Sequence, residues 1–126
     1  MEKQKYAAIV LAAGSGKRMN SQVHKQYLII QDRPVLYYSL KEFEDSAVDE
    51  IVLVVGKGEE KFCRKEIVDK YGISKVKAIV EGGKERYHSV FEGLKQTSDA
   101  DYVLIHDGAR PFVNQDIIRR CMQEVQ

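Results

Sequence analysis

The stretch LAAGSGKR, residues 11–18, places two glycines and two adjacent cations directly behind a short apolar run. Glycine backbone can approach a ligand closely, and Lys or Arg side chains pair with phosphate oxygens. The loop is not a Walker A motif, because Gly16 and Lys17 are followed by arginine, and Met19 breaks the dinucleotide fingerprint G-x-G-x-x-G. With Lys25 nearby, the pattern is typical of a phosphate-binding loop charged by side chains, and a plain turn with solvated cations is the alternative.

Two later stretches combine polar residues with glycine in the same way. EGGKERYHSV places Gly82 and Gly83 ahead of Ser89, and IHDGARPF places Asp107 behind another apolar run. Paired glycines allow backbone to pack on a flat ring, and a carboxylate at a strand end can hold Mg²⁺ against phosphate oxygens. Each stretch alone is also compatible with an ordinary turn. All three together favour a site for a phosphorylated ligand.

Four short, nearly continuous apolar runs predict the strands of a parallel sheet covered on both faces, over residues 6–12, 51–55, 76–80 and 102–106. Apolar residues at helical spacing predict four helices, after Pro34, before Gly72, over residues 87–94 and after a cap at Asn114. We expect the tyrosines and methionines of these patterns to lie in the core. Residues 27–30 predict a small extra strand.

This alternation predicts a doubly wound α/β fold, with a mostly parallel, Rossmann-like sheet that has helices on both faces. We expect a single domain over residues 1–126. Ligands of such sheets bind beyond the carboxyl ends of the strands, so the three polar stretches should meet there. Four strands make a small open sheet, and the fold is therefore expected to lack a C-terminal portion.

Composition excludes several classes of protein. The 126 residues are 44% hydrophobic and 31% charged, as in ordinary globular proteins. A net charge of +1, with both signs interspersed, favours neither nucleic acid nor a membrane surface, and no run approaches the roughly 20 apolar residues of a membrane helix. The N-terminus has a basic head and an apolar run, but the run is short and leads into the glycine loop, which predicts a strand of a cytoplasmic protein and not an export signal.

Other chemistries find little support in the sequence. Cys63 and Cys121 form no CxxC motif and lie in predicted helices, which indicates free, reduced thiols. His24, His88 and His106 are expected in different loops and lack ligand spacing, so zinc is not expected. No serine has the flanking glycines of a nucleophile elbow.

The chain resembles the family of cytidylyltransferases that act on 2-C-methyl-D-erythritol 4-phosphate in the non-mevalonate isoprenoid pathway. The resemblance lies in the order and separation of four stretches, LAAGSGKRM, HKQYL, GGKERYHSV and HDGARPF. The resemblance spans residues 6–112 and about the first half of a typical member. It implies a nucleotidyltransferase that moves CMP from CTP to this sugar-alcohol phosphate, with Mg²⁺ as cofactor, pyrophosphate as the leaving group and no covalent enzyme intermediate. The complete protein is expected to be a homodimer.

The resemblance also implies roles for individual residues. Arg18 and Lys25 match the catalytic cations that stabilise charge on the α-phosphoryl group and on the departing pyrophosphate. Asp107 matches a metal-linked carboxylate, and Arg110 matches an arginine near the substrate or the subunit interface. The positions that match nucleotide-binding residues are Ala12, Ala13, Gly14, Gly16, Gly83, Lys84, Ser89 and Gly108.

The chain also departs from the family pattern. His24 stands where the family usually has proline before the catalytic lysine, and Tyr87 replaces a smaller or amide residue. The family's later segment, which forms the dimer and reaches the partner's substrate, lies beyond these 126 residues. We therefore expect this chain alone to bind CTP weakly and to turn over poorly or not at all.

Two other functions stay open at this point. A ribitol 5-phosphate cytidylyltransferase has a similar glycine loop, but usually carries bulkier residues at the positions of Gly108 and Ala109. A non-catalytic nucleotide-binding or assembly module would use the same fold without turnover. Intact Arg18, Lys25 and Asp107 favour an enzyme, because a binding module has less need for charge around a leaving pyrophosphate.

Overall fold

The computed structural model describes residues 4–12, 29–30, 33–83, 85–107 and 115–124. Its main sheet has four parallel strands in the order β5-β4-β1-β6. The strands are β1 (Tyr6–Ala12), β4 (Glu50–Val55), β5 (Val76–Glu81) and β6 (Tyr102–Asp107). Each predicted strand is confirmed to within one residue at either end, because a continuous apolar run stops where the chain reaches the edge of the sheet.

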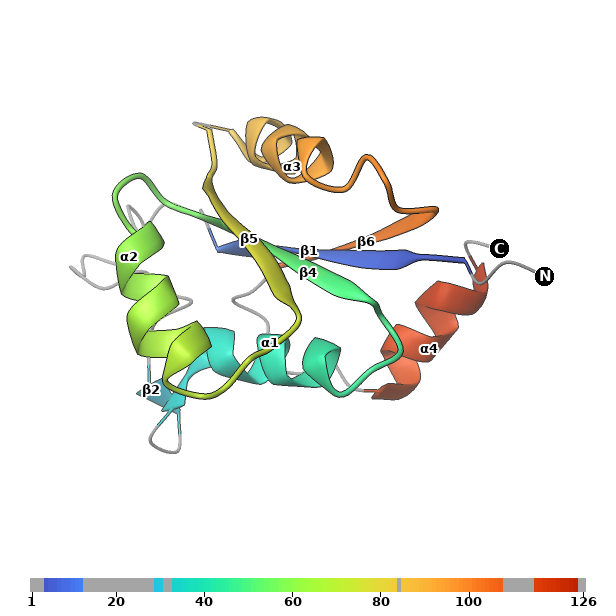
Figure 1. Ribbon diagram of the computed structural model, residues 1–126, viewed down its shortest axis with the longest axis horizontal. Helices are drawn as coiled ribbons and strands as arrows, with labels where there is room; N and C mark the ends of the chain where they lie inside the picture. Colours follow the sequence, from blue (N-terminus) through green and yellow to red (C-terminus); the bar gives the residue numbers. More distant parts are fainter. Residues whose placement is uncertain (1–3, 13–28, 31–32, 84, 108–114, 125–126) are drawn as a thin grey trace.

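Helices cover both faces of this sheet, as Figure 1 shows, with α3 on one face and α1, α2 and α4 on the other. They are α1 (Val35–Glu44), α2 (Glu60–Cys63), α3 (Arg86–Lys95) and α4 (Gln115–Glu124), and α2 runs into a π-helical segment, η3 (Arg64–Asp69). The doubly wound α/β fold is therefore confirmed. Within the described ranges, no helix has the length and apolar character needed to cross a membrane.

The described part of the predicted extra strand, residues 29–30, is a strand. β2 (Ile29–Ile30) pairs antiparallel with β3 (Arg33–Pro34), which leads directly into α1. The predicted N-terminal cap of the last helix, Asn114, lies outside the described residues.

Side chains of β1 alternate between two apolar layers. Ala8 and Val10 pack with residues of α1, η3 and α4, whereas Ile9 and Leu11 pack on the α3 side with Val90. Every residue of β1 and β4 is buried, as expected of strands that are covered on both faces. Cys63 forms no disulfide and lies buried in the first layer.

The outer strands differ from this expectation. Only one residue of β5 and one of β6 are fully buried, and Ile105 of β6 is 44% exposed. Each outer strand has only one neighbouring strand, so its outer edge is open. β5 and β6 are therefore less buried than predicted for strands that are covered on both faces.

The apolar pattern of α3 was also expected in the core, and three of its residues lie outside it. Tyr87, Phe91 and Leu94 are 68%, 58% and 42% exposed. The helix approaches the sheet through Gly93, where an added Cβ would lie 2.7 Å from Cγ2 of Ile9. Phe91 is two residues from Gly93, about 200° around the helix, and therefore points away from the sheet. Backbone proximity at a glycine, and not the apolar stripe, sets the buried side of α3.

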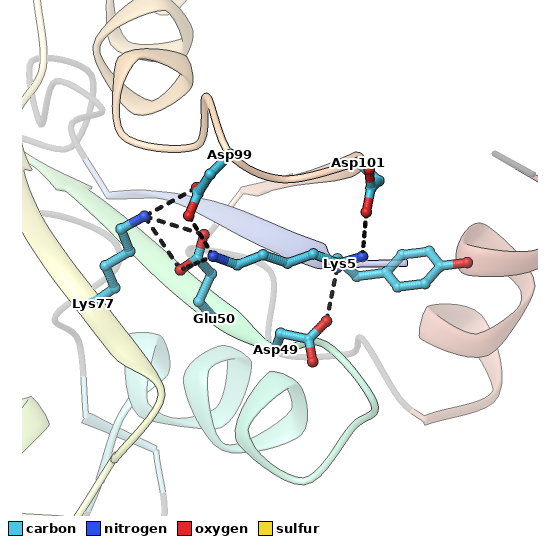
Figure 2. Close-up of polar contacts among 7 residues, drawn as sticks. Lys5, Asp49, Glu50, Lys77, Asp99 and Asp101 are labelled. Atoms are coloured by element: carbon cyan, nitrogen blue, oxygen red, sulfur yellow. Dashed lines mark hydrogen bonds and ion pairs between the residues drawn. The ribbon is translucent and has the colours of Figure 1, made fainter. Parts of the chain in front are cut away.

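Four charged side chains form a closed network at the amino ends of the strands (Figure 2). Nζ of Lys5 lies 2.5 Å from a carboxylate oxygen of Asp99 and 3.4 Å from one of Glu50. Nζ of Lys77 lies 3.3 Å from oxygens of both acids. The network joins β4, β5, the residue before β1 and the loop before β6.

Two backbone contacts extend this network, also drawn in Figure 2. The N–H of Lys5 donates to Oδ2 of Asp101 at 2.6 Å, and the N–H of Tyr6 donates to Oδ2 of Asp49 at 2.8 Å. The amino edge of the sheet is thus held by interactions between residues far apart in the sequence, on the opposite side from the edge where ligands of such sheets bind.

We predict a pH-dependent contribution of this network to stability. Hydrogen bonds from Lys5 and Lys77 lower the pKa of Asp99 from 3.8 to about 2. A carboxyl group with a lowered folded-state pKa stabilises the protein above about pH 4, and this contribution is lost as the pH falls toward about 2. Asp99→Asn should therefore lower the melting temperature at pH 7, and the difference from wild type should shrink below about pH 4.

Thermal unfolding followed by circular dichroism measures this difference. Asp69→Asn on the exposed end of η3 is the matched control and should show no such trend. A difference between Asp99→Asn and wild type that stays constant from pH 7 to about pH 2 would contradict the prediction.

Candidate functional site

The carboxyl ends of all four strands are nearly level. Ala12 at the end of β1 is paired with Val55 of β4, and Val55 is paired with Glu81 of β5. Leu11 is paired with Asp107, the last residue of β6. β1 and β6 lie side by side where the strand order reverses, which is the usual position of a ligand crevice in doubly wound sheets.

The structure brings parts of all three polar stretches to this edge. Four predicted site residues lie in its described part, either at a strand end or between β5 and the first turn of α3: Ala12, Gly83, Ser89 and Asp107. The other eight lie outside the described residues: Ala13, Gly14, Gly16, Arg18, Lys25, Lys84, Gly108 and Arg110. The convergence follows from parallel pairing, and the role of each residue stays a prediction.

Asp107 and Ala12 end neighbouring strands, which run roughly 4.8 Å apart in a sheet. Ala12 is 1% exposed, and Asp107 is exposed. An exposed carboxylate beside buried backbone offers a hard oxygen ligand to a cation. The described residues contain no group of three potential metal ligands.

The turn between β5 and α3 leaves no room for a side chain at Gly83. A Cβ added there would lie 2.2 Å from Cβ of His88, closer than real side chains approach. The N–H of Gly82 donates to the carbonyl of Val55 at 2.8 Å, which extends the pairing of β4 and β5 past the end of β5. The backbone of Gly82 is thus held at the carboxyl edge of the sheet, and Gly83 beside it has no side chain. A flat ring could stack on this backbone.

Ser89 is less accessible than its predicted role suggests. It is 4% exposed, in the first turn of α3, and its N–H donates to the carbonyl of Glu85 at 3.2 Å. A nucleotide would meet only a small part of this residue.

The histidines occupy other positions than expected. His88 belongs to α3 and His106 to β6, so neither lies in a loop. His106 contacts α1, where its Nε2 lies 3.4 Å from Oγ of Ser39 and its ring packs edge-on against Phe43 at 5.6 Å. The prediction that the histidines lie in different loops is therefore wrong for both of these residues.

Sequence reasoning missed two polar side chains at this edge. Oε2 of Glu81 accepts the N–H of Gly58, in the turn after β4, at 2.6 Å. Nδ1 of His88 accepts the N–H of Glu85 at 3.3 Å. The available signals were the position of Glu81 at a strand end and the three-residue spacing of Glu85 and His88 at a helix start.

The model of the 2-C-methyl-D-erythritol 4-phosphate cytidylyltransferase family (IspD) matches residues 6–126. The chain belongs to this family. The cytidylyltransferase of that name from Lachnoclostridium phytofermentans is 54% identical over 123 residues, which cover 98% of this chain and 53% of that protein. The one from Lachnospira eligens is 54% identical over 119 residues, 94% of this chain and 52% of that protein.

Solved structures agree with this assignment. 4-Diphosphocytidyl-2C-methyl-D-erythritol synthase from Anaerococcus prevotii superimposes with a TM-score of 0.79 at 31% identity, covering 97% of this chain and 51% of that chain. The bifunctional IspDF from Campylobacter jejuni gives a TM-score of 0.78 at 25% identity, covering 98% of this chain and 31% of that chain. The chain thus spans about half the length of the curated relatives that it matches.

We predict that Gly83→Ala destabilises the protein by about 1–3 kcal/mol, the usual cost of overpacking, because the new methyl group must displace the start of α3. Urea unfolding followed by circular dichroism measures this loss. Ser98→Ala, at an exposed position, is the control and should change stability by less than about 0.5 kcal/mol. Equal stability of Gly83→Ala and wild type would show that the turn tolerates a Cβ.

Proposed function

We propose that the carboxyl edge of the sheet binds CTP, and that the complete protein transfers CMP from CTP to 2-C-methyl-D-erythritol 4-phosphate. The observation that carries this proposal is that the described parts of three family stretches, at Ala12, Gly83 and Asp107, lie along one edge of a sheet. The match of this chain to the family runs from residue 6 to residue 126. The intact glycine at position 108 and alanine at position 109 favour methylerythritol phosphate over ribitol 5-phosphate as the acceptor.

In the proposed reaction, a phosphate oxygen of the acceptor attacks the α-phosphorus of CTP. A new P–O bond forms, the bond from the α-phosphorus to the bridging oxygen of the β-phosphate breaks, and pyrophosphate leaves. Transfer of this kind depends mainly on positioning and on positive charge placed in advance. Arg18 and Lys25 are proposed to supply that charge.

The remaining roles concern the nucleotide and a divalent cation. Backbone at Ala12 and Gly83 is proposed to line the nucleotide, together with Ser89 and the other matching positions Ala13, Gly14, Gly16, Lys84 and Gly108. The exposed carboxylate of Asp107 suits Mg²⁺, which when bound would neutralise triphosphate charge. Arg110 is proposed to lie near the acceptor or the subunit interface.

The location, oligomeric state and substrates of the complete protein are also proposals. We propose a cytoplasmic homodimer that acts on small phosphorylated substrates. The net charge of +1, with both signs interspersed along the sequence, supports small substrates over nucleic acid or an anionic membrane as partners.

We predict that this chain binds CTP weakly and in preference to ATP when Mg²⁺ is present. Selectivity is expected from the turn at Gly83, because its bare backbone is proposed to lie against the base. Calorimetric titration with each nucleotide measures it, and the full-length Lachnoclostridium phytofermentans relative serves as a positive control. Equal affinity for both nucleotides, or no binding by a folded chain, would contradict the prediction.

A substitution of Arg18 separates an enzyme from a non-catalytic binding module. In the complete protein, Arg18→Gln should lower kcat by about 10²–10³-fold, the size of effect seen for a single stabilising donor, with a much smaller change in CTP affinity. Steady-state kinetics with methylerythritol phosphate, and in parallel with ribitol 5-phosphate, measure both quantities. A variant that loses affinity alone would favour the binding module.

A further inference from the structure

Two side chains outside the predicted site residues hold the turn that begins at Gly82. On the strand side, Oε2 of Glu81 accepts the N–H of Gly58 at 2.6 Å, while the N–H of Gly82 donates to the carbonyl of Val55 at 2.8 Å. These two bonds tie the turn after β4 to the turn after β5. An ionised carboxylate makes the first of them stronger than a bond between neutral groups.

On the helix side, His88 holds the same turn in two ways. Its Nδ1 accepts the N–H of Glu85 at 3.3 Å, and its own N–H donates to the carbonyl of Glu85 at 3.0 Å. Its Cβ occupies the place that a side chain on Gly83 would need. One residue of α3 thus bonds to Glu85 and packs closely against Gly83.

Neither side chain contributes to the core. Glu81 and His88 are both exposed, and the β4–β5 pairing is made by backbone groups. The ring of Tyr87 packs on the imidazole of His88 at 4.3 Å between centroids and narrows the orientations open to it. Both side chains direct an acceptor at a backbone N–H group of a turn at the site edge. The bond to His88 is also a capping box, so it fixes the first turn of α3 together with the turn that leads into it.

We propose that Glu81 and His88 are positioning residues of the nucleotide site. They hold the turn around Gly82 and Gly83 in the shape that receives the base and ribose of CTP. This inference rests on the proposed function. When the turn already has its binding shape, CTP binding does not have to order it, and the entropy cost of that ordering is avoided. Loss of Glu81 or His88 should therefore weaken the affinity for CTP.

Paired substitutions test the role of each acceptor. Glu81→Ala and His88→Leu remove the acceptor, whereas Glu81→Gln and His88→Asn keep an acceptor atom in a similar place. The first pair should weaken CTP binding by about three- to tenfold, the effect of one lost hydrogen bond, and the second pair should stay within about twofold of wild type. Glu66→Ala on η3 is the matched control and should bind CTP as wild type does.

The measurements are the Kd for CTP, by calorimetry with Mg²⁺, and the amide hydrogen exchange of Gly58 and Glu85. Faster exchange of the Gly58 amide in Glu81→Ala and of the Glu85 amide in His88→Leu, with unchanged exchange in β1 and β4, is expected. It would show that the turn is loosened while the fold is kept.

The outcomes separate this inference from the proposed function. If wild type binds CTP and the acceptor-free variants bind it equally well, the positioning role is overturned and the nucleotide site stands. If the conservative variants lose as much affinity as the acceptor-free ones, the hydrogen bonds are not the cause and the inference is also overturned. If the folded wild-type chain binds no CTP, the proposed function fails for this chain and the inference fails with it.

Discussion

Parallel pairing of β1 with β4 on one side and with β6 on the other is the constraint on which the rest of the structure depends. It makes β1 a fully buried central strand and brings the ends of all four strands to one level. Residues as far apart in the sequence as Ala12, Gly83 and Asp107 lie along one edge of the sheet for this reason. A shift of one residue in this register would turn every β1 side chain to the opposite layer, so the apolar core also fixes the geometry of the candidate site.

The two edges of the sheet are built from different chemistry. Paired charges close the amino edge, where Lys5, Glu50, Lys77 and Asp99 neutralise one another. The carboxyl edge carries an exposed carboxylate, glycine backbone and short hydrogen-bonded turns. Stability and ligand binding can therefore be changed separately. Acid weakens the first edge through Asp99, whereas substitutions at Glu81 or His88 act on the second.

The sequence predicted the strands well because an uninterrupted apolar run has few alternatives in a doubly wound sheet. It predicted the burial of α3 poorly, because the approach of Gly93 to Ile9 decides which side faces the sheet and leaves Phe91 outside. The glycines and cations of the sequence predicted a phosphorylated ligand, and only the family resemblance predicted that this ligand is CTP. The roles of Glu81 and His88 could not be predicted, because their hydrogen bonds to Gly58 and Glu85 form only when the turns are folded.

The central claim is that CTP binds at the carboxyl edge of this sheet. The most direct test is to titrate CTP and Mg²⁺ into the ¹⁵N-labelled chain and to map the amide shifts. Binding at this edge should concentrate the shifts at Ala12, Gly82, Gly83, Ser89 and Asp107 and leave the amides of the amino-edge network unmoved. Shifts centred on that network, or a folded chain with no shifts at CTP concentrations that saturate the full-length relative, would contradict it.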